Sequence, residues 1–169
     1  MVLFTNTVSA QDTTKLSLLF IGDIMQHDTQ IAAAFDPITK KHNYAECFQH
    51  VKPVFESADM TIGNLELALG GPPYHGYPNF SAPDELVETL IWSGVDVLVT
   101  ANNHCLDRGK KGLQRTVAVL DTFGIPHTRY VRRLRASRQY LPVVAREERF
   151  QNKPVELHLW HEWHRGNET

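Results

Sequence analysis

Three short motifs in this sequence carry carboxylate, amide and imidazole side chains. They are Gly22-Asp23, Gly63-Asn64-Leu65-Glu66 and Ala101-Asn102-Asn103-His104. The donors that concern us most are Asp23, Glu66, Asn103 and His104. Such a mixed oxygen and nitrogen set suits hard or borderline divalent metals. A two-metal centre needs carboxylates and an amide oxygen to hold cations about 3.5–4 Å apart, with an imidazole near the leaving oxygen. If the motifs converge in space, they predict phosphoesterase-type chemistry.

Each motif also has a purely structural interpretation. An Asp after a Gly, such as Asp23, often caps a turn. Glu66 on its own can be a solvated residue, and the run 102–104 can form a turn because it suits neither helix nor strand. Asp107 is expected to cap and orient its loop through backbone amides or Arg108 and not to bind metal.

Other polar residues are less informative. His27 and Asp28 can add a ligand to the site or point to solvent, and we leave both interpretations open. Cys47 is expected to be a small core residue. The remaining histidines in this region are assigned to the surface: His42, His50 and His75.

Each motif follows an apolar stretch that reads as a β-strand, at 16–21, 59–62 and 95–100. The first stretch is fully apolar, which is typical of a central strand covered on both faces. The carboxyl ends of parallel strands share one edge of a sheet, where sites of α/β folds are built. The three motifs are therefore expected to meet there.

Helical spacing of apolar residues separates these strands. It predicts helices at 44–57, broken near Pro53, at 81–94 and at 109–123, and a short one at 29–35. Residues 70–79 contain too much Gly and Pro for a regular element and should form a surface loop near the site. A fourth strand should begin at Ile125. The alternation of strand and helix predicts an α/β fold with mainly parallel strands and helices on the faces.

Composition fits one domain of 169 residues, with 42% hydrophobic and 21% charged residues. There is no run of eighteen apolar residues that would indicate a membrane-spanning helix.

We interpret 1–15 as a signal-peptide remnant and lead-in, the alternative being a frayed cytoplasmic terminus. Charge is uneven, because residues 1–128 hold 8 Lys and Arg against 14 Asp and Glu, whereas 129–169 hold 9 against 5.

The motifs together resemble the CapA family of poly-γ-glutamate capsule synthesis proteins, related to calcineurin-like metallophosphoesterases. Leu-Phe-Ile-Gly-Asp-Ile-Met at 19–25, Gly-Asn-Leu-Glu at 63–66 and Ala-Asn-Asn-His-Cys-Leu-Asp-Arg-Gly at 101–109 carry the resemblance, which covers about 16–128. It implies the N-terminal half of a calcineurin-like sandwich, with Asp23, Glu66 and Asn103 as metal ligands and His104 as general acid. It also implies two divalent ions (Mn, Zn or Fe) in the intact parent and an exported protein.

The resemblance further implies a role in capsule or cell-surface polymer biosynthesis. The substrate would be an anionic polymer, or one containing phosphate or amide groups. The partner would be a capsule synthesis complex. The fragment itself is expected to be inactive. The alternative is a non-catalytic exported module that binds polymer. We expect no nucleic-acid partner, although an Arg-rich tail is a feature of nucleic-acid binders.

Residues 129–169 look foreign to this family, since 8 of the 10 arginines lie there. We interpret them as an out-of-frame tail without a native fold. When the codons of Trp160-His161-Glu162-Trp163 are read one base later, they encode four other residues in a row: Gly, then Met or Thr, then Asn or Ser, and then Gly. Gly-Thr-Asn-Gly is similar to the next loop of the family. His161, Glu162 and His164 are therefore not taken as metal ligands.

Sequencing the genomic DNA from codon 120 to several hundred bases past the stop tests this hypothesis. We expect one extra base near codon 128, whose removal opens a frame with Gly-Thr-Asn-Gly and later histidine motifs. A confirmed frame with no continuation in any other frame would show that our interpretation of the tail is wrong.

Overall fold

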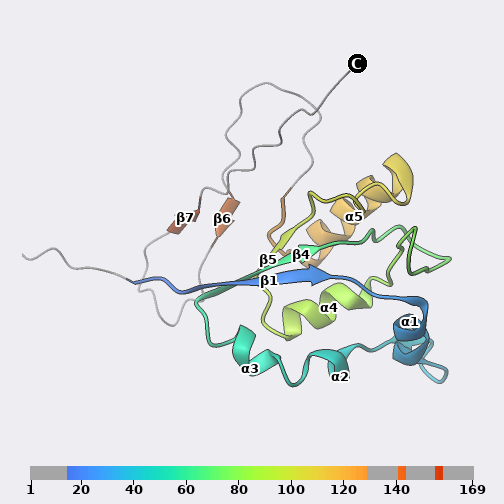
Figure 1. The fold of residues 1–169 in the computed structure, drawn as a ribbon, viewed down its shortest axis with the longest axis horizontal. Helices are drawn as coiled ribbons and strands as arrows, with labels where there is room; N and C mark the ends of the chain where they lie inside the picture. The colour runs from blue at the N-terminus through green and yellow to red at the C-terminus, as the bar shows by residue number, and fades with distance from the viewer. Residues whose placement is uncertain (1–14, 129–140, 144–154, 158–169) are drawn as a thin grey trace, which may run out of the picture.

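A three-stranded parallel sheet in the order β1, β4, β5 lies at the centre of the fold (Figure 1). The computed structural model describes residues 15–128, 141–143 and 155–157. Its elements, in chain order, are β1 (Leu18–Ile24), α1 (Asp28–Ala34), β2 (Phe35–Asp36), β3 (Lys41–His42), α2 (Ala45–Phe48), α3 (Lys52–Phe55), β4 (Met60–Leu65), α4 (Glu85–Trp92), β5 (Val97–Val99), α5 (Gly109–Phe123), β6 (Leu141–Val143) and β7 (Val155–Leu157). The α/β fold class predicted from the sequence is confirmed.

The central strand is β4, all but one of whose residues are buried. We predicted that 16–21 would be a central strand, and among the described residues its neighbour in the sheet is β4 alone, so this stays a prediction. β1 lies at the edge of the described sheet, where Phe20 is 63% exposed and Leu18 is 37% exposed. A continuous apolar run indicates a strand, but the order of strands depends on long-range pairing that the run does not encode.

The first two strands extend further toward their motifs than predicted. β1 continues to Ile24 and β4 to Leu65. As a result Asp23 and Asn64 lie inside the ladder, and Glu66 follows it directly. Backbone pairing therefore fixes the positions of these polar residues.

The helices form close to the predicted positions. The expected break near Pro53 separates α2 from α3, with the proline in the first turn of α3, where its missing N–H costs little. α5 covers 109–123 as predicted and ends at Gly124, which has a φ of 68°. A left-handed residue at this position favours glycine because it has no Cβ.

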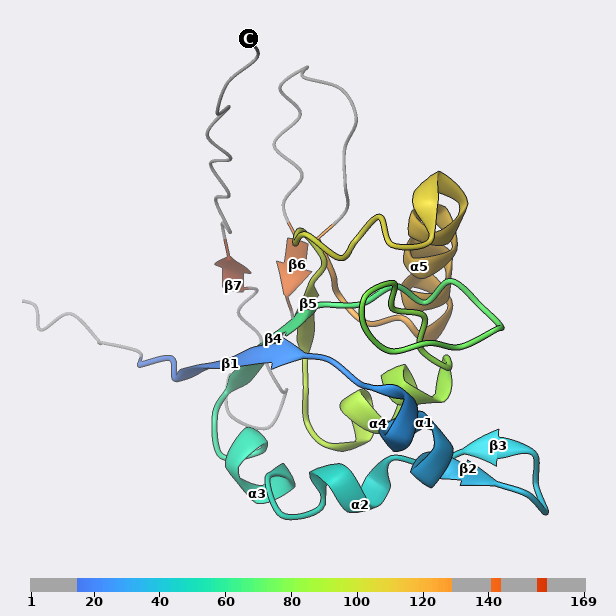
Figure 2. The same cartoon turned by 45° about the vertical axis from the view of Figure 1, so that its right-hand side comes forward.

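The main core forms where α4 packs against the sheet and contacts α2 and α5 (Figures 1 and 2). Leu86, Val87 and Leu90 present the buried face of α4. Asp84 is the N-cap residue of this helix, but its side chain makes no capping bond. Its carboxylate instead accepts two hydrogen bonds from Arg115 of α5, both 2.7 Å long, which tie the two helices together.

The predicted fourth strand is present only as an isolated parallel bridge between Leu98 and His127. The Leu98 amide donates to Pro126 O (2.9 Å), and the Thr128 amide donates to Leu98 O (3.0 Å). The chain thus runs beside β5 at the side opposite β4.

Two smaller predictions are wrong. Cys47 is exposed and not in the core; it and Cys105 are both free. The His42 side chain is only 10% exposed, and its ring packs near those of Phe35, Tyr44 and Tyr74. His50 and His75 are exposed, as expected.

Most of the stretches 1–15 and 129–169 lie outside the described residues, so the predictions of a signal remnant and an out-of-frame tail stay predictions. Within the second stretch, β6 and β7 pair antiparallel. Among the helices that the structure describes, none has the length and apolar character needed to cross a bilayer.

Two adjacent residues of α4 offer a matched test of the core. Leu90 is fully buried, whereas Ile91 is 40% exposed. Leu90→Ala should lower the free energy of unfolding by about 2–5 kcal/mol through lost burial and a cavity. Ile91→Ala should cost less than about 1 kcal/mol. Urea unfolding measures both, and equal losses would contradict the packing of α4 described above.

Candidate metal centre

Two carboxylates meet at the carboxyl ends of β1 and β4 through one amide. The parallel register pairs Asp23 with Asn64, and Glu66 follows two residues later, on the same side of the strand. Asn64 Nδ2 donates to Asp23 Oδ1 (2.8 Å) and to Glu66 Oε2 (3.1 Å). Asp23 and Glu66 are therefore brought together, as the sequence predicted.

The position of Asp23 depends on an irregularity in β1. Ile21 pairs with Gly63 and Asp23 pairs with Asn64, so Gly22 is an extra residue without a partner in the ladder. Bulges of this kind re-aim side chains near functional sites. Here the extra residue places Asp23 beside the amide of Asn64.

The carboxylates of Asp23 and Glu66 lie close enough to affect each other's ionisation. Partial burial raises the pKa of the Glu66 carboxyl, and the neighbouring Asp23 carboxyl raises it further, whereas His104 acts in the opposite direction. Two negative charges this close disfavour each other. A cation between them would relieve that repulsion.

A second amide connects this pair to the third motif. Asn102 Nδ2 donates to Asn64 Oδ1 (3.1 Å) and to Leu65 O (2.9 Å). Its own Oδ1 accepts a hydrogen bond from the His104 backbone amide (3.1 Å). Asn102 thus links the loop after β5 to the end of β4 and positions His104.

The imidazole of His104 is held by Asp107. His104 Nδ1 lies 2.8 Å from Asp107 Oδ2, and both side chains are largely buried, at 13% and 11% exposed. The same oxygen accepts a hydrogen bond from the Phe80 amide (2.8 Å). The prediction that Asp107 orients its loop is confirmed, and its partners are His104 and Phe80.

The Asn103 side chain is exposed and makes no hydrogen bond within the described part of the chain, so its role as a metal ligand stays a prediction. The amides that contact other residues of the site are those of Asn64 and Asn102. The sequence could have pointed to Asn64 as a residue of the site. Side chains alternate along a strand, so residues 64 and 66 lie on the same side. No comparable rule separates Asn102 from Asn103 in a turn.

The segment 70–80 forms a wall beside the site, as expected for a loop near it. The Gly76 amide donates to Asp28 Oδ1 (2.7 Å). The buried Phe80 ring lies edge-on to His104 at 4.7 Å and to His27 at 5.6 Å between ring centroids. Asp28 therefore anchors this wall, and the ring of His27 packs against it.

The donor set fits a divalent cation in its chemistry. The Asp23 and Glu66 carboxylates would supply hard oxygen ligands of the kind that such cations prefer. The described residues contain no group of three or more His, Cys, Asp or Glu side chains that would hold a metal ion together. Asp23 and Glu66 are thus the two carboxylates that this region could offer to a metal ion.

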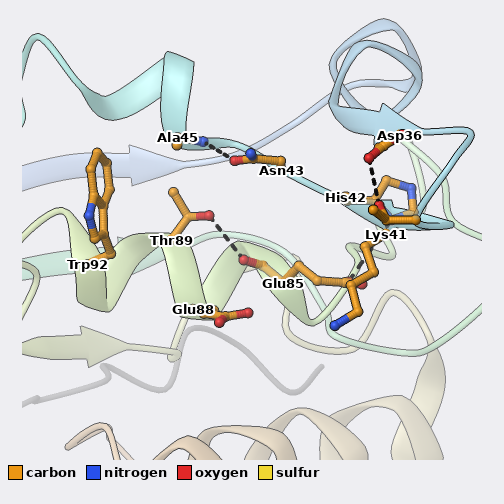
Figure 3. A pocket seen from close by; sticks show the side chains of 10 residues that line it. Asp36, Lys41, His42, Asn43, Ala45, Glu85, Glu88, Thr89 and Trp92 are labelled. Atoms are coloured by element: carbon orange, nitrogen blue, oxygen red, sulfur yellow. Dashed lines mark hydrogen bonds and ion pairs between the residues drawn. The ribbon is translucent and has the colours of Figure 1, made fainter.

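A separate groove of about 510 Å³ lies along α4 on the side of the β2–β3 ladder (Figure 3). Its charged lining residues include Asp36, Lys41, Glu85 and Glu88, with Trp92 among the rest. None of Asp23, Glu66, Asn103 and His104 lines it.

The parallel sheet, its helices and the polar strand ends make this chain the N-terminal part of a calcineurin-like α/β fold. Residues 17–151 match the family described as bacterial capsule synthesis protein PGA_cap. Because the match covers most of the sequence, the chain belongs to this family. The matched range runs past Thr128, the predicted end of the resemblance.

Curated relatives agree with this assignment. The capsule biosynthesis protein CapA of Bacillus anthracis is 28% identical over 116 residues, which are 65% of this chain and 27% of that protein. The PGA biosynthesis protein CapA of Bacillus subtilis (strain 168) is 30% identical over 111 residues, 60% of this chain and 27% of that protein. An uncharacterized protein of Sinorhizobium fredii, y4sH, is 34% identical over 89 residues, 47% of this chain and 19% of its own length. The matched part of this chain thus spans about a quarter of either CapA protein.

The raised pKa of Glu66 predicts a pH-dependent stability in the presence of a chelator. Between the ordinary value of 4.5 and the raised one, the folded state keeps a proton that the unfolded state has lost. Stability therefore falls as pH rises through this window. Glu66→Gln avoids that loss, so the variant should be more stable than the wild type at pH 7, and the gap should shrink below pH 4.5.

Chemical unfolding at a series of pH values measures this difference. The exposed Glu88→Gln is the matched control and should follow the wild type at every pH. A pH-independent effect of Glu66→Gln would contradict the account of the carboxylate pair.

Proposed function

We propose that this chain carries part of a metal-assisted, hydrolase-type site for a capsule or cell-surface polymer. Membership of the PGA_cap family supports the polymer, and poly-γ-glutamate is the polymer we propose, with a polysaccharide as the second candidate. The observation that carries the site is the Asp23 and Glu66 pair, joined by Asn64 and Asn102 to His104.

Asp23 and Glu66 would hold a divalent ion (Mn, Zn or Fe) through their carboxylates. We keep Asn103 as a proposed ligand, which requires its exposed side chain to turn inward. When bound, such ions polarise a phosphoryl or acyl oxygen and lower the pKa of water. We propose two ions in the longer parent protein and weak binding without turnover in this chain alone.

His104 would act as a general acid that donates a proton to the leaving group. The Asp107 carboxylate would accept a hydrogen bond from His104 Nδ1. That leaves His104 Nε2 as the ring nitrogen that can donate or accept a proton. The hydrogen bond from the His104 amide to Asn102 fixes the backbone under this ring. Asp107 and Asn102 therefore orient the imidazole without touching substrate.

The setting we propose is outside the cytoplasm, in the periplasm or at the cell surface, with a capsule synthesis complex as partner. In that setting the substrate would be an anionic polymer or one with phosphate or amide linkages. We propose no role in nucleic-acid binding.

Titration of Mn²⁺ into the chain by calorimetry tests the carboxylate pair. We expect weak binding that Asp23→Asn and Glu66→Gln each reduce at least tenfold, because each removes a charged ligand. Glu88→Gln is the matched control and should bind as the wild type does. Binding that neither substitution changes would place the metal elsewhere and sink the proposed site.

A longer protein with the frame restored tests the chemistry. We expect two equivalents of Mn²⁺ or Zn²⁺ and hydrolysis of a phosphodiester or γ-glutamyl amide that His104→Ala reduces about 10²–10⁴-fold. Full metal loading without turnover on both substrate types would favour a non-catalytic polymer-binding module.

A further inference from the structure

One aromatic side chain beside the imidazole has no structural role in the core. Tyr77 is 68% exposed, yet its ring centroid lies 6.5 Å from that of His104 and 6.3 Å from that of Phe80. Phe80, by contrast, is fully buried under the same imidazole. Tyr77 therefore presents a wide ring surface to solvent next to the candidate catalytic group.

The backbone holds this ring in place. His75 and Ser81 form an antiparallel bridge, with two amide-to-carbonyl bonds of 2.9 and 3.0 Å, which closes a short loop around Tyr77. Asp28 binds the Gly76 amide and Asp107 binds the Phe80 amide, so both ends of the loop are tied to elements of the site.

Gly76 allows the close approach that this anchoring needs. A Cβ at this position would lie 2.8 Å from His27 Cα and 2.9 Å from the Asp28 nitrogen, and both are backbone atoms that cannot move aside cheaply. The residue before Tyr77 thus rests directly on the chain that follows β1. The backbone that carries the ring is therefore anchored before a ligand binds, and such preorganisation lowers the entropy cost of binding.

The charge of the wall indicates the kind of ligand. Residues 67–83 contain no Asp or Glu, although residues 1–128 as a whole are acidic. Its exposed side chains include His75, Tyr77 and Asn79. Arg108 also reaches this segment, donating from Nη1 to Pro73 O (3.4 Å). The two carboxylates that do reach this segment, those of Asp28 and Asp107, each accept a hydrogen bond from its backbone.

From these observations we propose that Tyr77 is a specificity-determining residue, whose ring packs against the methylene groups of an anionic γ-linked glutamyl chain beside His104. The inference rests on the proposed function. Each such unit offers two methylene carbons for contact with a ring and one carboxylate, which residues 67–83 do not repel with acidic side chains of their own. Tyrosine suits this role because it provides apolar area at low conformational cost.

The test is binding of a fluorescein-labelled γ-linked glutamate decamer to the chain in Mn²⁺, followed by anisotropy. Tyr77→Ala should weaken binding about tenfold, as expected for loss of one aromatic contact, and Tyr77→Phe should stay within about twofold. Phe123→Ala, which removes a partly exposed ring from the end of α5, is the matched control and should not change binding. Thermal unfolding should be nearly the same for the wild type and the two Tyr77 variants, because Tyr77 contributes little buried area.

Several results would overturn the inference. Unchanged decamer affinity in Tyr77→Ala would remove Tyr77 from the contact while leaving the Mn²⁺ result on Asp23 and Glu66 untouched. Tyr77-dependent binding of a neutral dextran oligosaccharide, but not of the decamer, would show that the ring serves a sugar and the ligand class is wrong. No decamer binding by the wild type would refute both the inference and the proposed polymer.

Discussion

The parallel pairing of β1 with β4 is the constraint on which the site depends. It sets Asp23 opposite Asn64 and leaves Glu66 on the same side, so that one amide group can satisfy two carboxylates. Without this register the two acids would lie at different places along the edge. Burial and the nearby Asp23 carboxylate both raise the pKa of Glu66, and the backbone pairing keeps the two acids close despite this unfavourable interaction.

Neutral amides, and not ion pairs, connect the three motifs. Asn64 and Asn102 each use their NH₂ group as a donor and their oxygen as an acceptor, so a continuous chain of hydrogen bonds runs from Asp23 to His104. A Lys or Arg in either position would neutralise the carboxylates permanently. Amides hold the geometry while leaving the negative charge available to a cation.

Much of this arrangement could be predicted from the sequence. Apolar periodicity, with a glycine at each end, predicted both ends of α5, which begins at Gly109 and is followed by Gly124. The order of the motifs predicted which strand ends would meet. The order of the described strands could not be predicted, since strand order depends on distant pairing. The hydrogen bonds from Asn102 to Asn64 and Leu65 could not be predicted either, because a turn has no fixed period that says which way a side chain points.

The unpaired Gly22 gives the first motif a dependence on chain length as well as on residue type. If the same residues paired in regular register, without the bulge, Gly22 would pair with Asn64 and Asp23 with Leu65, whose side chain points to the opposite face of the sheet. The bulge is therefore what sets Asp23 opposite Asn64, and a homologue with one residue fewer before the acid would reach the same pairing only with an unbulged strand. Homologues are best compared here by counting residues between the last regular pair, Ile21 with Gly63, and the acid that follows.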